Sequence, residues 1–496
     1  MPAIHRLPDL HLNRREELLF GVLVLFVASV YFATFIGITS SNDGSHYALV
    51  RAIVDHRRFE ISDYLAFTEN QDYAINGDLR FSDRPPGTAL WAAPWFALGT
   101  WLPTPQTLPP SKHDSGNPLI LGIGAATALA GALAVGVFWR LLRHYFGLSR
   151  FSSTFTALAL AFGSVLWKYG SVLYSHSLAA LVILGALYLG LWLVRWQTLP
   201  PLTGFAFGFF LGYTLLTEYT NALYVLAVAL FVGGGLWQAT LAGLRSPDSR
   251  TAWLLGWGAL ILGGLLPILF LLGYNTLNFG GPLTLSRTQV DLVRWPENEN
   301  FATSFATPIG LGLRGMLFYS PENMNQGLLL LSPIAWLSLA GLPLGWQHVR
   351  RRADLLFSVG VFVLFLLLFS ASTTYNPYTN DGRYLTPFLP LWWLPLAFWV
   401  EFAYRRLEGD LPQLAGGLLL FGTLAISVRN VAVHIAVSWN YDLKFSELLN
   451  MSTPLPNLER ILGVLFPNVG NLWWLWLALL PAVGLWWWWV VTHAEQ

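Results

Sequence analysis

The chain has 496 residues, of which 54% are hydrophobic and only 11% are charged. Soluble proteins carry about 25% charged residues, so this composition indicates an integral membrane protein. A formal net charge of +1 excludes a strongly basic nucleic-acid-binding protein, and the absence of cysteine excludes disulfides, thiolate metal sites and cysteine nucleophiles.

Apolar runs suited to membrane helices recur along the chain, and we expect about twelve spans. In chain order they are Leu18–Thr39, Pro118–Trp139, Phe151–Trp167, His176–Val194, Leu202–Thr217, Tyr219–Leu241, Ala252–Gly273, Gln326–Gln347, Leu355–Ala371, Tyr384–Val400, Leu411–Val428 and Leu472–Val491. A further run, Pro86–Leu102, is broken by Pro94, and we interpret it as a helix lying at the membrane interface. The predicted fold class is an all-α polytopic membrane protein with no large soluble domain.

Basic residues in short loops predict the orientation. With the N-terminus in the cytoplasm, the short cytoplasmic segments hold Arg6, Arg14, Arg15, Arg140, Arg143, Arg150, Arg195, Arg245, Arg250, Arg350, Arg351, Arg352, Arg405 and Arg406. On the other side, only Lys168 and Arg383 lie in short loops. We therefore expect a single domain, 1–496, in the plasma (inner) membrane with both termini cytoplasmic. Three long loops, 40–117, 274–325 and 429–470, are expected outside.

A carboxylate follows the first span directly. Asp43 lies where that helix is expected to surface, and an ionised Asp there can accept a proton from a substrate hydroxyl. The alternative is structural, because Asn42 or Asp43 can cap a helix that continues through Tyr47. The two roles are compatible. His46, one turn along, is either a substrate contact or a packed loop residue.

The first external loop ends in a rigid basic motif. Two prolines after Asp83 and Arg84 fix the backbone there, and a rigidly held guanidinium suits a phosphate, which it can grip with two hydrogen bonds. An ordinary turn with an Asp–Arg pair is the alternative.

Further polar residues fall on the same predicted side. We expect one substrate cavity, lined by His46, Asp83, Tyr174, His176, Glu218, Arg287, Asp381 and Tyr384, with Arg383 beside it. Glu218 is the only charge in its turn, which can equally be a solvated turn. Arg383 and Tyr384 can also be interfacial anchors of the tenth helix. Arg383 is an uncompensated cation on the less basic side, which favours anion binding.

Taken together, these motifs resemble the membrane glycosyltransferases of the GT-C fold, and most closely the branch of protein mannosyltransferases and aminoarabinose transferases. The shared points are Asp43 after the first helix, Arg84-Pro85-Pro86 ending the first loop, and the Tyr-x-His motif at Tyr174–His176. The Tyr-Asn and Phe-Gly-x-Pro motifs after the seventh helix and the Arg-Tyr-Leu motif with spaced prolines at Asp381–Pro390 complete the set. The resemblance covers about residues 18–400.

The resemblance implies transfer of a sugar, with inversion, from a polyprenyl phosphate to an acceptor hydroxyl of a glycan, lipid or protein. Asp43 is then the catalytic base, and Arg84 and Arg383 hold the donor phosphate. No metal or other cofactor is required, although a divalent metal is compatible with it. The chain departs from its relatives at Gly44, where many have a second acid, and at Arg84, where the aminoarabinose enzymes have Lys and also carry a C-terminal soluble domain. The sugar and the acceptor are therefore not assigned.

Two other classes stay open at this point. A lipid-linked-sugar transporter or flippase also suits about twelve spans, although the sequence shows no repeat of matching half-motifs. The second alternative is an oligosaccharide ligase or polymerase that uses a diphosphate donor.

Overall fold

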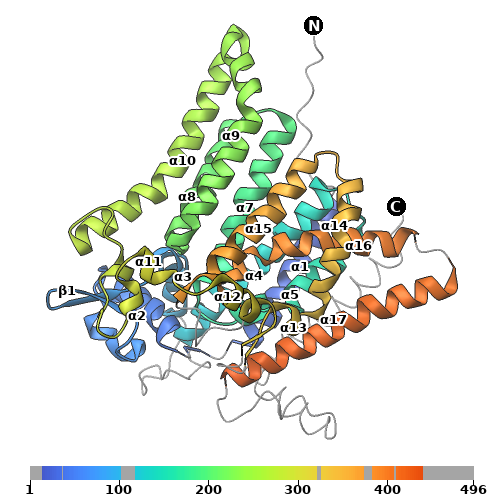
Figure 1. The fold of residues 1–496 in the computed structure, drawn as a ribbon. Helices are drawn as coiled ribbons and strands as arrows, with labels where there is room; N and C mark the ends of the chain where they lie inside the picture. Colours follow the sequence, from blue (N-terminus) through green and yellow to red (C-terminus); the bar gives the residue numbers. More distant parts are fainter. Residues whose placement is uncertain are drawn as a thin grey trace, which may run out of the picture.

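Helices dominate the described part of the protein (Figure 1). The structure is a computed structural model that describes residues 14–35, 37–38, 40–101, 118–320, 325–373, 382–406 and 409–439. Within these residues, eight helices are long and apolar enough to cross a membrane: Arg15–Ala33, Leu121–Tyr145, Ser175–Trp196, Tyr219–Arg245, Pro247–Phe279, Arg352–Ser370, Arg383–Arg406 and Leu411–Ala436. A shorter apolar helix is Pro201–Thr217. The predicted fold class is confirmed, whereas the predicted span Leu472–Val491 lies outside the described residues.

Among the described residues, nine long helices form the bundle: α1 (Arg14–Ala33), α4 (Pro118–Arg140), α7 (Ser175–Trp196), α8 (Pro201–Thr217), α9 (Ala222–Arg245), α10 (Pro247–Phe279), α15 (Arg352–Ser370), α16 (Leu389–Arg406) and α17 (Asp410–Trp439). Helix α7 is central, because it packs on α4, α8 and α9 and is the most completely buried of the spans. It is almost wholly apolar between Leu178 and Val194, as a helix surrounded by other helices must be.

Glycines set the closest helix pair, α8 with α10. Gly204, Gly208 and Gly212 repeat every fourth residue on α8, on the face toward α10. A Cβ on Gly208 would lie 2.1 Å from the carbonyl oxygen of Leu260. The two backbones can therefore approach only because these side chains are absent, as is common between membrane helices.

Two predicted spans are not single helices. Phe151–Trp167 is divided into α5 (Arg150–Phe162) and α6 (Leu166–Gly170), because the chain turns at Gly163 and Ser164. Gln326–Gln347 is divided into α13 (Leu328–Leu331), the 3₁₀ turn η6 (Pro333–Trp336) and α14 (Leu337–His348), because Pro333 has no N–H to continue the first helix. Short apolar runs do not reveal such breaks.

The loop after α1 is a folded cap rather than an open loop. It contains α2 (Ser41–His56), η1 (Ser62–Thr68), the antiparallel strands β1 (Tyr73–Asn76) and β2 (Leu79–Ser82), and α3 (Gly87–Gly99). Helix α3 is the predicted Pro86–Leu102 helix, and it packs on α2, α4 and α8. In Figure 1 these elements lie together at one end of the bundle.

The loop after α10 covers this cap. Its elements are η4 (Ser286–Thr288), η5 (Pro296–Asn298), α11 (Phe301–Ser304), α12 (Ile309–Leu317), β3 (Tyr319–Ser320) and β4 (Asn325–Gln326). The backbone N–H of Ile75 in β1 donates to the carbonyl oxygen of Gln289 at 2.6 Å, which joins the two loops. The short elements η3 (Tyr219–Asn221) and η8 (Arg383–Phe388) close the same end.

Two further differences from the expected boundaries concern the ends of helices. Helix α17 continues to Trp439, beyond the predicted end at Val428. After α4 the chain makes a π-helical turn, η2 (Leu141–Tyr145), so this helical stretch also extends beyond the predicted Trp139. The rest of the expected third loop, 440–470, lies outside the described residues.

Candidate active site

Asp43 is held in the first turn of α2. The extended residue Ser40 precedes the helix as its N-cap, and Asp43 is the third helical residue. The backbone N–H and hydroxyl of Ser40 donate to Asp43 Oδ1 at 2.7 and 2.8 Å, and the Gly44 N–H donates to it at 3.1 Å. The expected cap at Asn42 or Asp43 is therefore wrong by two or three residues, because Asp43 reaches back to Ser40 as the acidic half of a capping box.

The neighbouring glycine is required by packing. A Cβ on Gly44 would lie 1.8 Å from the carbonyl oxygen of Phe67 in η1. A side chain at this position would therefore displace η1 from α2.

A hydrogen-bonded relay joins Asp43 to the start of α7. The Tyr174 and Ser40 hydroxyl oxygens are 2.8 Å apart. Since the Ser40 hydroxyl proton is given to Asp43, Tyr174 must donate to Ser40. Burial and then the charge of Asp43 raise the pKa of Tyr174, which keeps its proton in place for this bond. Asp43 itself is fully buried, and these donors contact its Oδ1.

A second carboxylate lies beside Arg84. The guanidinium of Arg84 is 3.3 Å from Asp83 Oδ1 and 3.2 Å from Asp72 Oδ1, while the Ser45 hydroxyl donates to Asp83 at 3.2 Å. Burial raises the pKa of Asp83 to about 6, although Arg84 and Arg287 favour its ionised form. Burial disfavours the charge on Arg84, but Asp83 and Asp72 hold its pKa above the ordinary value.

His46 is a neutral buried residue. Burial, and then the positive charge of Arg84, lower the pKa of His46 to about 3. Its side chain is 1% exposed, and its Nδ1 has no hydrogen-bond partner among the described residues.

A cavity of about 440 Å³ opens beside these groups. Its polar lining includes Asp83, Arg84, Glu218, Arg287 and Tyr384, which were all predicted at the site, Arg84 for the donor phosphate and the others for the substrate cavity. Its apolar lining includes Leu223, Leu285, Phe305, Leu368 and Phe369. The cavity therefore combines cationic, acidic and hydrocarbon groups.

The remaining arginines are anchored around the same cavity. Arg383 Nη2 is 3.0 Å from the Tyr384 hydroxyl, and Arg287 Nε donates to Asn298 Oδ1 at 2.8 Å. The positive charge of Arg383 acts to lower the pKa of the Arg84 guanidinium, which indicates that the two side chains lie near each other. Three positive charges thus surround one region of the cap.

Aromatic stacking links the relay to the cavity wall. The His176 ring lies 5.8 Å from the Tyr174 ring and 5.8 Å from the Tyr384 ring. Glu218 accepts a hydrogen bond from the Ser175 hydroxyl, so it is tied to the start of α7 rather than solvated in a turn.

The structure thus brings ten of the eleven predicted residues into one polar region. Asp43, His46, Tyr174, His176 and Arg383 are not in the cavity wall but belong to the network behind it. Asp381 lies outside the described residues. Sequence reasoning missed Ser40. A serine three residues before an acidic residue is the pattern of a capping box, and this pattern could have indicated its role. It also missed Asp72, for which the sequence carries no signal, because its pairing with Arg84 depends on the β1–β2 hairpin.

No protein-family model and no curated protein matches the chain. Among solved structures, ArnT from Cupriavidus metallidurans bound to undecaprenyl phosphate is similar with 14% identity and a TM-score of 0.47, covering 92% of this chain and 76% of ArnT. The archaeal oligosaccharyltransferase AglB from Archaeoglobus fulgidus, in complex with an inhibitory peptide and a dolichol-phosphate, gives 13% identity and a TM-score of 0.47, over 86% of this chain and 56% of AglB. An apo structure of the Archaeoglobus fulgidus oligosaccharyltransferase gives 12% identity, a TM-score of 0.45 and 59% coverage of that chain.

This chain therefore spans little more than half the length of the two archaeal structures. The likeness concerns the general helical arrangement, and no residue role is taken from it.

Proposed function

We propose that this protein is an inverting glycosyltransferase that moves a sugar from a polyprenyl-phosphate donor to an acceptor hydroxyl. The observation that carries the proposal is the mixed lining of this cavity. Arginine and carboxylate side chains line it together with leucine and phenylalanine side chains. A lipid phosphate combines the same two chemistries, an anionic head and an apolar tail.

The arginines give the leaving phosphate its binding site. Arg84 and Arg287 line the cavity, and Arg383 lies behind them. Cations placed where negative charge develops lower the barrier most when water is excluded, and Arg84 is only 19% exposed. Since Asp83 and Asp72 already pair with Arg84, the donor phosphate competes with them for its N–H groups.

Asp43 is the proposed general base. Inversion requires a base on the face of the anomeric carbon opposite the leaving phosphate. Three donors contact Asp43 Oδ1, which holds the orientation of the carboxylate. Asp83 is the competing candidate, because it lines the cavity directly and burial raises its pKa toward neutrality.

Transfer of a radiolabelled sugar in detergent tests the function. We expect transfer from a polyprenyl-monophosphate donor, with inverted anomeric configuration in the product. Arg84→Ala should slow it roughly 10- to 100-fold at limiting donor, whereas the matched variant Arg80→Ala should not, because the Arg80 guanidinium binds carbonyl groups of its own hairpin, lies over the Tyr73 ring and does not line the cavity. Transfer from a diphosphate donor alone would indicate a ligase, and movement of the lipid across vesicles without transfer would indicate a transporter.

We also propose that the active site faces the non-cytoplasmic side of the plasma membrane. Single-cysteine variants test this cleanly, since the chain has no native cysteine. An impermeant thiol reagent added outside should label a cysteine at Arg80 and not one at Arg352. The reverse pattern would overturn the orientation.

A further inference from the structure

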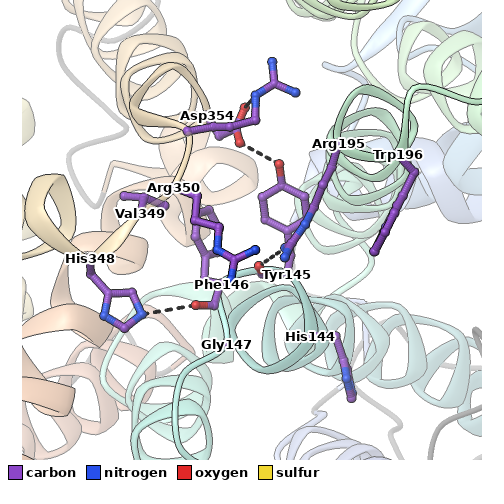
Figure 2. A pocket seen from close by; sticks show the side chains of 11 residues that line it. His144, Tyr145, Phe146, Gly147, Arg195, Trp196, His348, Val349, Arg350 and Asp354 are labelled. Carbon is purple, nitrogen blue, oxygen red and sulfur yellow. Dashed lines mark hydrogen bonds and ion pairs between the residues drawn. The ribbon is translucent and has the colours of Figure 1, made fainter. Parts of the chain in front are cut away.

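A second cavity lies at the other end of the bundle. Its volume is about 490 Å³, and it is lined by the turn after α4, the end of α7, the connection from α14 to α15 and Asp354 of α15 (Figure 2). Helix α7 separates the two regions, since Tyr174 precedes its first turn and Arg195 lies in its last. Its 22 residues extend about 33 Å at 1.5 Å per residue. The second cavity is therefore distinct from the one at Arg84.

Three arginines give this second cavity an excess of positive charge. Arg195 comes from the end of α7, and Arg350 and Arg351 come from the loop between α14 and α15. Its one carboxylate, Asp354, is buried, accepts a hydrogen bond from the Tyr145 hydroxyl at 2.6 Å, and lies 3.7 Å from Arg351. Within the described part of the chain, neither Arg195 nor Arg350 forms an ion pair with an acidic side chain.

Two of the three arginines and His348 contact the backbone of neighbouring segments. Arg195 Nη1 donates to the carbonyl oxygen of Tyr145, and Arg351 Nη1 donates to that of Val194 at 3.0 Å. His348 Nε2 is 3.2 Å from the carbonyl oxygen of Phe146. Figure 2 shows the Arg195 and Arg350 side chains entering from different segments toward the space beside Tyr145. Because the walls are held in advance, a ligand has less side-chain entropy to remove on binding.

The chemistry of the walls favours a phosphate. Guanidinium groups grip phosphate oxygens with paired charge-assisted hydrogen bonds, and basic pockets between the ends of membrane helices suit anionic lipid head groups. Trp196, 43% exposed, stands at the rim, a usual place for tryptophan at a membrane surface. We propose that this cavity is a second ligand site that binds a phosphate group, carried by an anionic phospholipid or by a small soluble phosphate compound.

A local fluorescence probe tests the proposal on the full chain in detergent. Val349 lines the cavity, and the chain has no other cysteine, so Val349→Cys can carry one fluorophore. Dihexanoyl phosphatidylglycerol and glycerol 3-phosphate are titrated at constant ionic strength, with dihexanoyl phosphatidylcholine as the zwitterionic control. Arg350→Gln should weaken binding by about tenfold or more, the effect of losing one charge-assisted contact. Arg352→Gln is the matched control, because Arg352 lies over the Trp346 ring and outside the cavity wall.

The outcomes separate the two sources of phosphate. Saturation by phosphatidylglycerol alone, weakened by Arg350→Gln and not by Arg352→Gln, supports a phospholipid site. Saturation by both compounds with similar affinity and the same Arg350 dependence supports a site for a soluble phosphate. No saturable signal with either compound, or equal weakening by the two variants, would overturn the proposal.

Discussion

The substitution Asp43→Asn should remove transfer while leaving the fold intact. Asparagine keeps the shape of the side chain and a carbonyl oxygen that can accept the hydrogen bonds of Ser40 and Gly44. It removes the proton acceptor. Without a general base, the rate of transfer should fall by about 10²–10⁴-fold.

The cost in stability can be worked from the three bonds to Asp43 Oδ1. A hydrogen bond to a charged group contributes about 1.5–3 kcal/mol, against about 1 kcal/mol for a neutral one. Because the three donors share one oxygen, we expect Asp43→Asn to lower the free energy of unfolding by roughly 1–3 kcal/mol. The loss of a negative charge in the first turn of α2 adds about 0.3–1 kcal/mol. The variant should melt at a lower temperature but still bind donor.

The assay is the initial rate of sugar transfer at saturating donor, with the melting temperature measured on the same preparation. Asp55→Asn is the matched control, because Asp55 lies on the same helix in an exposed pair with Arg51. Near-normal transfer by Asp43→Asn would refute the reasoning. Full loss in Asp83→Asn with activity kept in Asp43→Asn would move the base to the cavity wall.

Three further results are expected. Arg84→Ala should raise the donor KM roughly 10- to 100-fold, the equivalent of about 1.5–3 kcal/mol. Arg84→Lys should restore part of this loss, and Arg80→Ala should leave the donor KM unchanged. An unchanged donor KM in Arg84→Ala would show that Arg84 does not bind the phosphate. Because Asp83 ionises near pH 6 and then competes with the donor for Arg84, the donor KM should rise as the pH rises from about 5 to 7, and a slope that persists in Asp83→Asn would contradict this account. Gly208→Ala should lower the melting temperature, since its Cβ would meet Leu260 at 2.1 Å, whereas Gly233→Ala has open space; equal melting of the two variants would count against the glycine contact.

The sequence alone determined the membrane class and most of the helices. Continuous apolar runs have no other stable environment than lipid or other helices, so hydropathy is sufficient to find α1, α4, α7, α9 and α10. It also located the polar region, because Arg84, Glu218, Arg287 and Tyr384 interrupt apolar sequence at the same predicted side. Both features depend on residues that are close together in the sequence, so the sequence alone can reveal them.

Only the tertiary structure decided which of these residues share a wall. Asp83 lines the cavity and Asp43 lies behind it, because the β1–β2 hairpin and the first turn of α2 converge through Ser45. The pairing of Arg84 with Asp72 depends on the same hairpin.

The second cavity illustrates the same limit at longer range. Arg195 and Arg350 are far apart in sequence, and hydropathy could place them only on one side of the membrane. Both line the cavity because the end of α7, the end of α14 and the start of α15 lie side by side. The hydrogen bond from Arg351 to the carbonyl oxygen of Val194 joins two of these segments. Such convergence arises from helix packing between distant segments, and no local pattern encodes it.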